Sequence, residues 1–194
     1  MNYKNESILI DVDDVIVQNA FIDAINVFKG TNHKEEDFTT YFIDDIVFSD
    51  NEKKQFREFL LTYNIYENCK LIAGVEEVLP CLCNILDVYI CSSCIVKGLE
   101  KYSGIFFKRK FDFLLEKFPY IDPDKIIFTS SKNNFRGFDY QIDDRVENLK
   151  GDIRCKMLFS SYHNRDIDYG VLKKMEILRV NSWSEILNNI KNMH

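Results

Sequence analysis

Three carboxylates, Asp11, Asp13 and Asp14, follow directly on an apolar run near the N-terminus. The β-forming residues 7–10 predict a buried strand, so the acids stand where the backbone leaves the sheet. Alternation predicts Asp11 and Asp13 on one side and Asp14 on the other, where Asp14 only stabilises a turn. Two carboxylates held together repel unless a cation, a shared proton or donor groups compensate. The pattern therefore suits a magnesium and phosphoryl-transfer site.

Polar residues also follow several other predicted strands. Strands are expected at residues 87–91, 125–128, 140–142, 154–159 and 176–180. Helices are expected at residues 15–28, 51–63, 107–118 and 182–190, and another is expected to open at residues 74–79. Strands that alternate with helices favour a parallel sheet covered on both faces, and ligands bind outside the carboxyl ends of such strands. The polar residues at these ends are Ser92, Ser93, Thr129, Asp143 and Asp144.

The predicted fold is α/β, a Rossmann-like three-layer parallel sheet with a small helical cap inserted after the first strand. Residues 1–16 and 73–194 would form the core. Residues 17–72 interrupt the βα rhythm with mixed acidic and aromatic sequence, so they would form the cap. At 194 residues, one core with a modest insertion is the expected organisation.

The composition of the chain restricts the partners that the protein can bind and the compartment that suits it. A net charge of −6 argues against binding a nucleic-acid polymer, which requires a basic face. No apolar run is long enough to span a membrane, and no signal-peptide core is present. The six cysteines are therefore read as reduced thiols of a cytoplasmic protein. The Cys91–Cys94 CxxC pair could be a redox motif, but free thiols are the favoured interpretation, since no clear helix start follows it.

The order of these motifs resembles the haloacid dehalogenase-like phosphatase superfamily. Its DxDx[TV] motif matches residues 11–15, a strand-end Ser matches Ser92, and a late acidic pair matches Asp143 and Asp144. A closer resemblance is to the 5′(3′)-deoxyribonucleotidase branch, the cytosolic type C 5′-nucleotidases. Residues 126–132 and 142–149 carry much of it.

The resemblance implies roles for the acids. Asp11 would be the nucleophile that becomes an aspartyl-phosphate, and Asp13 the general acid and then the base. Asp11, Asp13, Asp143 and Asp144 would hold Mg²⁺, with Asp13 contributing its backbone carbonyl. Adjacent residues cannot both point inward from a straight strand. Of the two, the resemblance implies that Asp144 binds the metal directly, with Asp143 in support.

Phosphate binding is implied for four residues. Ser92 would donate its hydroxyl to a phosphate oxygen, with Ser93 as the substitute. The cation is either Lys110, expected near the start of a helix, or Lys132, and Lys132 is preferred. Either lysine would neutralise charge on the phosphoryl oxygens in the transition state.

The implied activity is Mg²⁺-dependent hydrolysis of a small phosphomonoester, foremost a (deoxy)nucleoside 5′- or 3′-monophosphate. An aromatic cage including Phe21, Phe42 or Phe48 could stack the base. Asn19 stands where relatives with this activity often have an aromatic residue. Two alternatives stay open, namely a phospho-accepting signalling module and a binding protein of the same fold without turnover. Caps of such enzymes can take part in dimers, so a homodimer is compatible with the resemblance.

Overall fold

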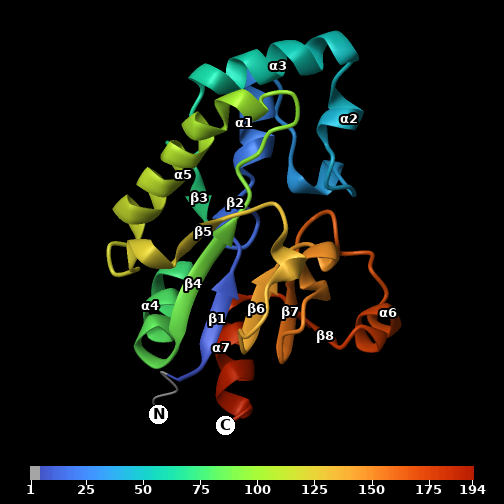
Figure 1. Ribbon diagram of the computed structural model, residues 1–194. Helices are drawn as coiled ribbons and strands as arrows, with labels where there is room; N and C mark the ends of the chain where they lie inside the picture. The colour runs from blue at the N-terminus through green and yellow to red at the C-terminus, as the bar shows by residue number, and fades with distance from the viewer. Residues whose placement is uncertain (1–4) are drawn as a thin grey trace.

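The computed structural model describes residues 5–194, so residues 1–4 of the predicted core lie outside the described part. Its centre is a six-stranded parallel sheet in the order β5-β4-β1-β6-β7-β8 (Figure 1). The strands are β1 (Ser7–Ile10), β4 (Asp87–Ser92), β5 (Ile126–Phe128), β6 (Tyr140–Asp143), β7 (Cys155–Phe159) and β8 (Ile177–Val180). The predicted α/β fold and its strands are confirmed.

Helices cover the sheet because its strands are apolar on both faces. Ile8 and Ile10 of β1 share one buried cluster with residues of α4 (Val75–Ile85), α5 (Ser103–Lys117) and α7 (Trp183–Asn192). A second, smaller cluster joins β7 and β8 to α6 (Tyr169–Lys174) and the 3₁₀ segment Val146–Lys150. None of the helices in residues 5–194 combines the length and apolarity needed to cross a bilayer.

The chain after β1 differs from the prediction. A tight turn, not a helix, follows Val12, whose carbonyl accepts hydrogen bonds from three successive backbone amides. The short strand β2 (Val17–Gln18) then pairs antiparallel with β3 (Lys70–Leu71). Left-handed backbone at Asp14 (φ 55°) and Asn19 (φ 58°) interrupts the expected helix, and α1 covers only Ala20–Lys29.

The segment between β2 and β3 stands over the carboxyl ends of the strands, and the C-terminus lies at the opposite end (Figure 1). It contains α1, the 3₁₀ segment Glu35–Asp37, α2 (Asp44–Val47) and α3 (Asp50–Thr62). Its apolar residues form their own cluster, centred on Ile25, Phe48 and Phe56. Ser49 caps α3 in a capping box with Glu52.

Two side chains connect distant elements near the carboxyl edge. Trp183 is fully buried, as expected of a core residue, and its indole N–H donates to the Val15 carbonyl at 2.9 Å. This contact ties α7 to the turn after β1. Arg109 of α5 donates to the carbonyls of Leu60, Leu61 and Tyr63 at 2.7–3.0 Å, which satisfies the end of α3.

Candidate functional site

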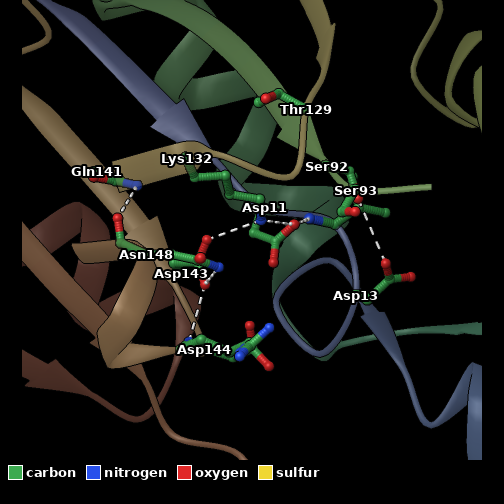
Figure 2. Close-up of polar contacts among 12 residues, drawn as sticks. Asp11, Asp13, Ser92, Ser93, Thr129, Lys132, Gln141, Asp143, Asp144 and Asn148 are labelled. Carbon is green, nitrogen blue, oxygen red and sulfur yellow. Dashed lines mark hydrogen bonds and ion pairs between the residues drawn. The ribbon is translucent and has the colours of Figure 1, made fainter. Parts of the chain in front are cut away.

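The carboxyl edge of the sheet brings three acids together. Asp11 follows β1, Asp143 ends β6, and Asp144 comes immediately after it (Figure 2). One carboxylate oxygen of each lies within 4.8 Å of the others. All three side chains are buried, with exposed fractions of 8% or less. This set of oxygen donors could hold a metal ion.

The two carboxylate oxygens of Asp11 differ in the donors that reach them. Oδ1 accepts a hydrogen bond from the Val12 amide at 2.6 Å and pairs with Lys132 Nζ at 2.6 Å. Within residues 5–194, no donor reaches Oδ2, and this oxygen is not among the buried unpaired atoms. Burial raises the pKa of Asp11 to about 6; Lys132 opposes this, and the neighbouring carboxylate of Asp143 adds to it. One oxygen is therefore anchored and the other is available.

Lys132 lies between the ends of β1 and β6. Its ammonium group contacts Asp11 at 2.6 Å and Asp143 Oδ2 at 2.9 Å, and its side chain is only 5% exposed. Burial lowers the pKa of Lys132, but the two carboxylates raise it further, so the net shift is upward and the lysine stays charged. A single positive charge thus faces three acids.

The acidic pair departs from the expectation that only one member points toward Asp11. β6 ends at Asp143, so the alternation of a straight strand no longer governs Asp144. Asp143 Oδ1 accepts from the Arg145 amide at 3.0 Å and from the Asn148 side chain at 2.8 Å. Burial raises the pKa of Asp144 well above its ordinary value, with the charge of Asp143 adding to the effect. A bound cation would relieve this repulsion.

Asp13 belongs to a second cluster of polar side chains, separate from the three acids above. Lys110 Nζ contacts its Oδ2 at 2.5 Å, and the Tyr66 hydroxyl donates to its Oδ1 at 2.8 Å. The Ser92 hydroxyl lies 3.5 Å from Oδ2 (Figure 2). Desolvation raises the pKa of Asp13, but Lys110 and Tyr66 outweigh it, so its pKa lies below the usual value. Its side chain therefore does not share the carboxylate set of Asp11, Asp143 and Asp144.

Lys110 and Ser92 form the other half of this group. Lys110 is 2% exposed and lies in the middle of α5, which begins four residues earlier than predicted. Its ammonium donates to the Ser92 hydroxyl at 2.6 Å and to the Ser93 carbonyl at 3.1 Å. Both candidate lysines thus reach the carboxyl edge: Lys132 contacts Asp11 and Asp143, and Lys110 contacts Asp13. The preference for Lys132 as the phosphate ligand stays a prediction.

His163 and Asn164 are polar site residues that the sequence analysis missed. His163 Nε2 lies 2.6 Å from Asp144 Oδ2, and Asn164 donates to the carbonyls of Asp144 and Phe159 at 2.7 Å. Burial lowers the pKa of His163 to about 4, so its imidazole is neutral at pH 7. Both residues lie in the loop after β7, a strand end to which the analysis gave no polar group.

Asp14 also lies elsewhere than alternation predicted. Its left-handed backbone directs the carboxylate toward the same edge, where it comes within 4.8 Å of Asp144 and His163. The expected turn contact is present but long, from the Asn19 amide to Asp14 Oδ1 at 3.4 Å. Burial raises the pKa of Asp14 to about 7, and Asp13 adds to this.

Replacing Asp14 by Asn should stabilise the metal-free protein as pH rises. A folded-state pKa above the unfolded one means that stability is lost between about pH 4 and 7, and Asn carries no such penalty. We expect a gain on the order of 1 kcal/mol at pH 8 and a smaller gain at pH 5. Urea unfolding at both pH values, with a chelator present, measures it. The exposed control Asp23→Asn should show no pH-dependent difference, and a pH-independent effect at Asp14 would contradict the argument.

A cavity of about 260 Å³ opens beside Asp13 and Lys110. Its wall includes Phe21 and Phe42, as the predicted aromatic cage requires, and also Tyr63 and Phe106. Phe48 is not part of it. That ring is 5% exposed and packs within the cluster of the inserted segment, because its position after α2 directs it away from the sheet edge.

The cysteines add no further chemistry to this edge. Cys91 and Cys94 are buried, and all six cysteines are free thiols, as expected. Burial raises the pKa of Cys91 to about 12 and of Cys94 to about 11, so neither is a thiolate at neutral pH.

Two solved structures share the fold of this chain. A haloacid dehalogenase-like protein of Agrobacterium tumefaciens aligns over 97% of this chain and 98% of its own, with a TM-score of 0.59 and 16% identity. YfnB of Bacillus subtilis, solved with magnesium bound, aligns over 97% and 98%, with a TM-score of 0.54 and 16% identity. The chain therefore shares the fold of these haloacid dehalogenase-like proteins.

Sequence comparison gives the particular family. The profile of the family described as 5′ nucleotidase, deoxy (Pyrimidine), cytosolic type C protein matches residues 5–193. The chain therefore belongs to this family of phosphoric monoester hydrolases. The 5′(3′)-deoxyribonucleotidase of Bacillus subtilis is 26% identical over 181 residues, covering 92% of this chain and 95% of its own. A protein of Staphylococcus aureus strain Mu50 is 27% identical over 192 residues, covering 96% and 98%.

Proposed function

We propose that this protein is a Mg²⁺-dependent phosphomonoesterase that hydrolyses a (deoxy)nucleoside 5′- or 3′-monophosphate through an aspartyl-phosphate on Asp11. The observation that carries this proposal is the difference in surroundings between the two carboxylate oxygens of Asp11. Oδ1 is fixed by the Val12 amide and Lys132, while Oδ2 has no donor from residues 5–194. An anchored carboxylate with one free oxygen, surrounded by cations and further acids, suits nucleophilic attack on phosphorus.

The metal would be held by Asp11, Asp143 and Asp144, together with the Asp13 backbone carbonyl. Three acids against the single charge of Lys132 leave an excess of negative charge. Burial raises the pKa of Asp144, and the charges of Asp143 and Asp11 raise it further. An all-oxygen donor set fits Mg²⁺. When bound, the ion supplies charge neutralisation and orientation for the phosphoryl group.

The chain's own residues would carry the two chemical steps. Asp11 Oδ2 bonds to phosphorus while the ester P–O bond breaks, and the leaving oxygen takes its proton from Asp13. Asp13 binds that proton once the phosphate has drawn Lys110, the main cause of its lowered pKa, away from its carboxylate. Water then attacks the aspartyl-phosphate, its proton passes to Asp13, and breaking of the Asp11 O–P bond releases phosphate and restores the carboxylate. Lys132, Lys110 and the Ser92 hydroxyl, with Ser93 beside it, face the charge that develops on the phosphoryl oxygens.

The cavity supports a nucleoside as the leaving group. Its aromatic wall, which includes Phe21, Phe42 and Phe106, can stack on a base, and Asp13 lines the same space. We assign residues 17–72 as the cap that supplies most of this wall, over a core of residues 1–16 and 73–194. A separate apolar cluster, formed mostly by residues of the inserted segment and joined by Tyr162 of the core, supports this division.

We place the protein in the cytoplasm, acting on free nucleotides rather than on a polymer. Six free thiols suit a reducing compartment. The net charge of −6 disfavours a polyanion, whereas a local cation can still attract one phosphate group.

Phosphate release from a panel of deoxy- and ribonucleoside 5′- and 3′-monophosphates tests the proposal. We expect turnover with Mg²⁺ and its loss, by about 10²-fold or more, after chelation, since the three acids then lack their counter-ion. Absence of turnover of every phosphomonoester by folded, Mg²⁺-loaded protein would sink the proposal. Phosphorylation by a small phosphodonor that persists without release would instead favour a phospho-accepting module.

A further inference from the structure

Tyr66 contacts the carboxylate of Asp13 from the inserted segment. Its hydroxyl donates to Asp13 Oδ1 at 2.8 Å. The residue is only 7% exposed, and its ring lies against Phe113 of α5, with centroids 5.4 Å apart. The Asn64 side chain accepts from the Tyr66 amide at 3.2 Å, which fixes the turn that carries the ring. The hydroxyl is therefore held in place from both the ring and the backbone.

The two oxygens of Asp13 have different neighbours. Oδ2 faces Lys110 at 2.5 Å and the Ser92 hydroxyl at 3.5 Å, whereas Oδ1 faces Tyr66. Lys110 and Ser92 are also the groups that the proposed function assigns to the phosphate. A phosphate dianion that draws these donors leaves Tyr66 as the remaining side-chain donor to Asp13 among residues 5–194.

We propose that Tyr66 is a positioning residue, which holds Asp13 through Oδ1 so that Oδ2 faces the leaving-group oxygen once phosphate has engaged Lys110 and Ser92. This inference rests on the proposed function. Tyr66 transfers no proton itself: the P–O bond breaks, and the leaving oxygen receives its proton from Asp13. The contact also makes the position of Asp13 depend on the inserted segment, because Tyr66 belongs to that segment and lines the cavity as well.

A purely structural role for Tyr66 predicts a different result from the positioning role. A nucleoside alkoxide is a poor leaving group and needs the proton, whereas the p-nitrophenolate of p-nitrophenyl phosphate leaves without it. Loss of a correctly placed Asp13 should therefore slow formation of the aspartyl-phosphate from the nucleotide and spare its formation from the aryl phosphate. The later water attack, in which Asp13 is the base, is common to both substrates. A general loss of packing would slow both substrates alike.

The experiment compares Tyr66→Phe with the wild type on a deoxynucleoside monophosphate and on p-nitrophenyl phosphate. We expect kcat/KM on the nucleotide, which reports the steps up to formation of the aspartyl-phosphate, to fall about 10- to 100-fold, as for loss of a hydrogen bond to a charged group. The fall in kcat/KM on p-nitrophenyl phosphate should stay below about threefold. Thermal unfolding of the variant verifies that it is folded.

Tyr162→Phe is the matched control, because Tyr162 is also 7% exposed and lines the same cavity but does not contact Asp13. It should change both substrates in parallel. Adding Tyr66→Phe to Asp13→Asn should cost nothing more, since Tyr66 acts through Asp13. Equal falls on both substrates, or additive losses in the double variant, overturn the inference. A wild type without phosphatase activity overturns the proposed function and this inference together, whereas an active wild type with an unaffected Tyr66→Phe overturns this inference alone.

Discussion

Asp11→Asn should abolish phosphate release while leaving the fold intact. The proposed reaction needs an anionic oxygen at the position of Asp11 Oδ2, and a carboxamide is neutral and a poor nucleophile. We expect kcat to fall by about 10³-fold or more. Release of inorganic phosphate from the best substrate, followed in single and multiple turnovers, measures the effect.

Stability separates this loss from unfolding. Burial raises the pKa of Asp11 from 3.8 to about 6, so the ionised side chain costs stability as pH rises through that window. Asn carries no such cost, and Lys132 keeps its contact with Asp143 at 2.9 Å. Metal-free Asp11→Asn should therefore be at least as stable as the wild type at pH 8. The control Asp87→Asn changes an acid at the first residue of β4, at the opposite edge of the sheet, and should keep nearly full activity. An active Asp11→Asn variant would exclude Asp11 as the nucleophile.

The strands and the strand-end acids could be predicted because each rests on a local signal. Apolar runs ending in acids or serines mark both the sheet and its carboxyl edge, as at residues 7–14 and 140–144. The errors lie beyond the strand ends, four residues after β1 and one residue after β6. Alternation predicts directions only while the backbone is extended, and it fails at Asp14 (φ 55°) and at Asp144, which follows the end of β6.

Other features of the site depend on long-range contacts that leave no local signal. His163 reaches Asp144 from the loop after β7, and Tyr66 reaches Asp13 across 53 positions of sequence. Phe48 has the same aromatic character as Phe42, yet one packs in the inserted segment's cluster and the other lines the cavity. The aromatic composition predicts that such a wall exists, but which rings form it depends on how the segment packs over the sheet.

Lys132→Met should make the stability of the protein depend on a divalent cation. Lys132 is the cation that pairs with both Asp11 and Asp143, and its side chain is 5% exposed. Its removal leaves buried carboxylates facing one another, which costs about 3–5 kcal/mol when a buried pair is broken. We therefore expect a large fall in the free energy of unfolding of the metal-free variant at pH 8.

The same charges determine how the stability of the Lys132→Met variant changes with pH and with Mg²⁺. Without Lys132, which lowers the pKa values of Asp11 and Asp144, those two pKa values rise further, so the variant should lose stability as pH increases from about 5 to 8. Added Mg²⁺ should raise its unfolding midpoint more than that of the wild type, because the ion replaces the missing charge at the same carboxylates. Its kcat should fall about 10²- to 10³-fold even at saturating Mg²⁺, since the transition state loses a fixed cation.

The control is Lys125→Met, which removes a lysine that pairs with Asp87 at the amino end of β4. Both partners of that pair are about one-third exposed, so its loss should cost no more than about 1 kcal/mol, without Mg²⁺ dependence and with activity unchanged. Urea unfolding at pH 5 and 8, with Mg²⁺ or a chelator, distinguishes the two lysines. If Mg²⁺ stabilises Lys132→Met no more than the wild type, then the acids at the ends of β1 and β6 do not share one cation site.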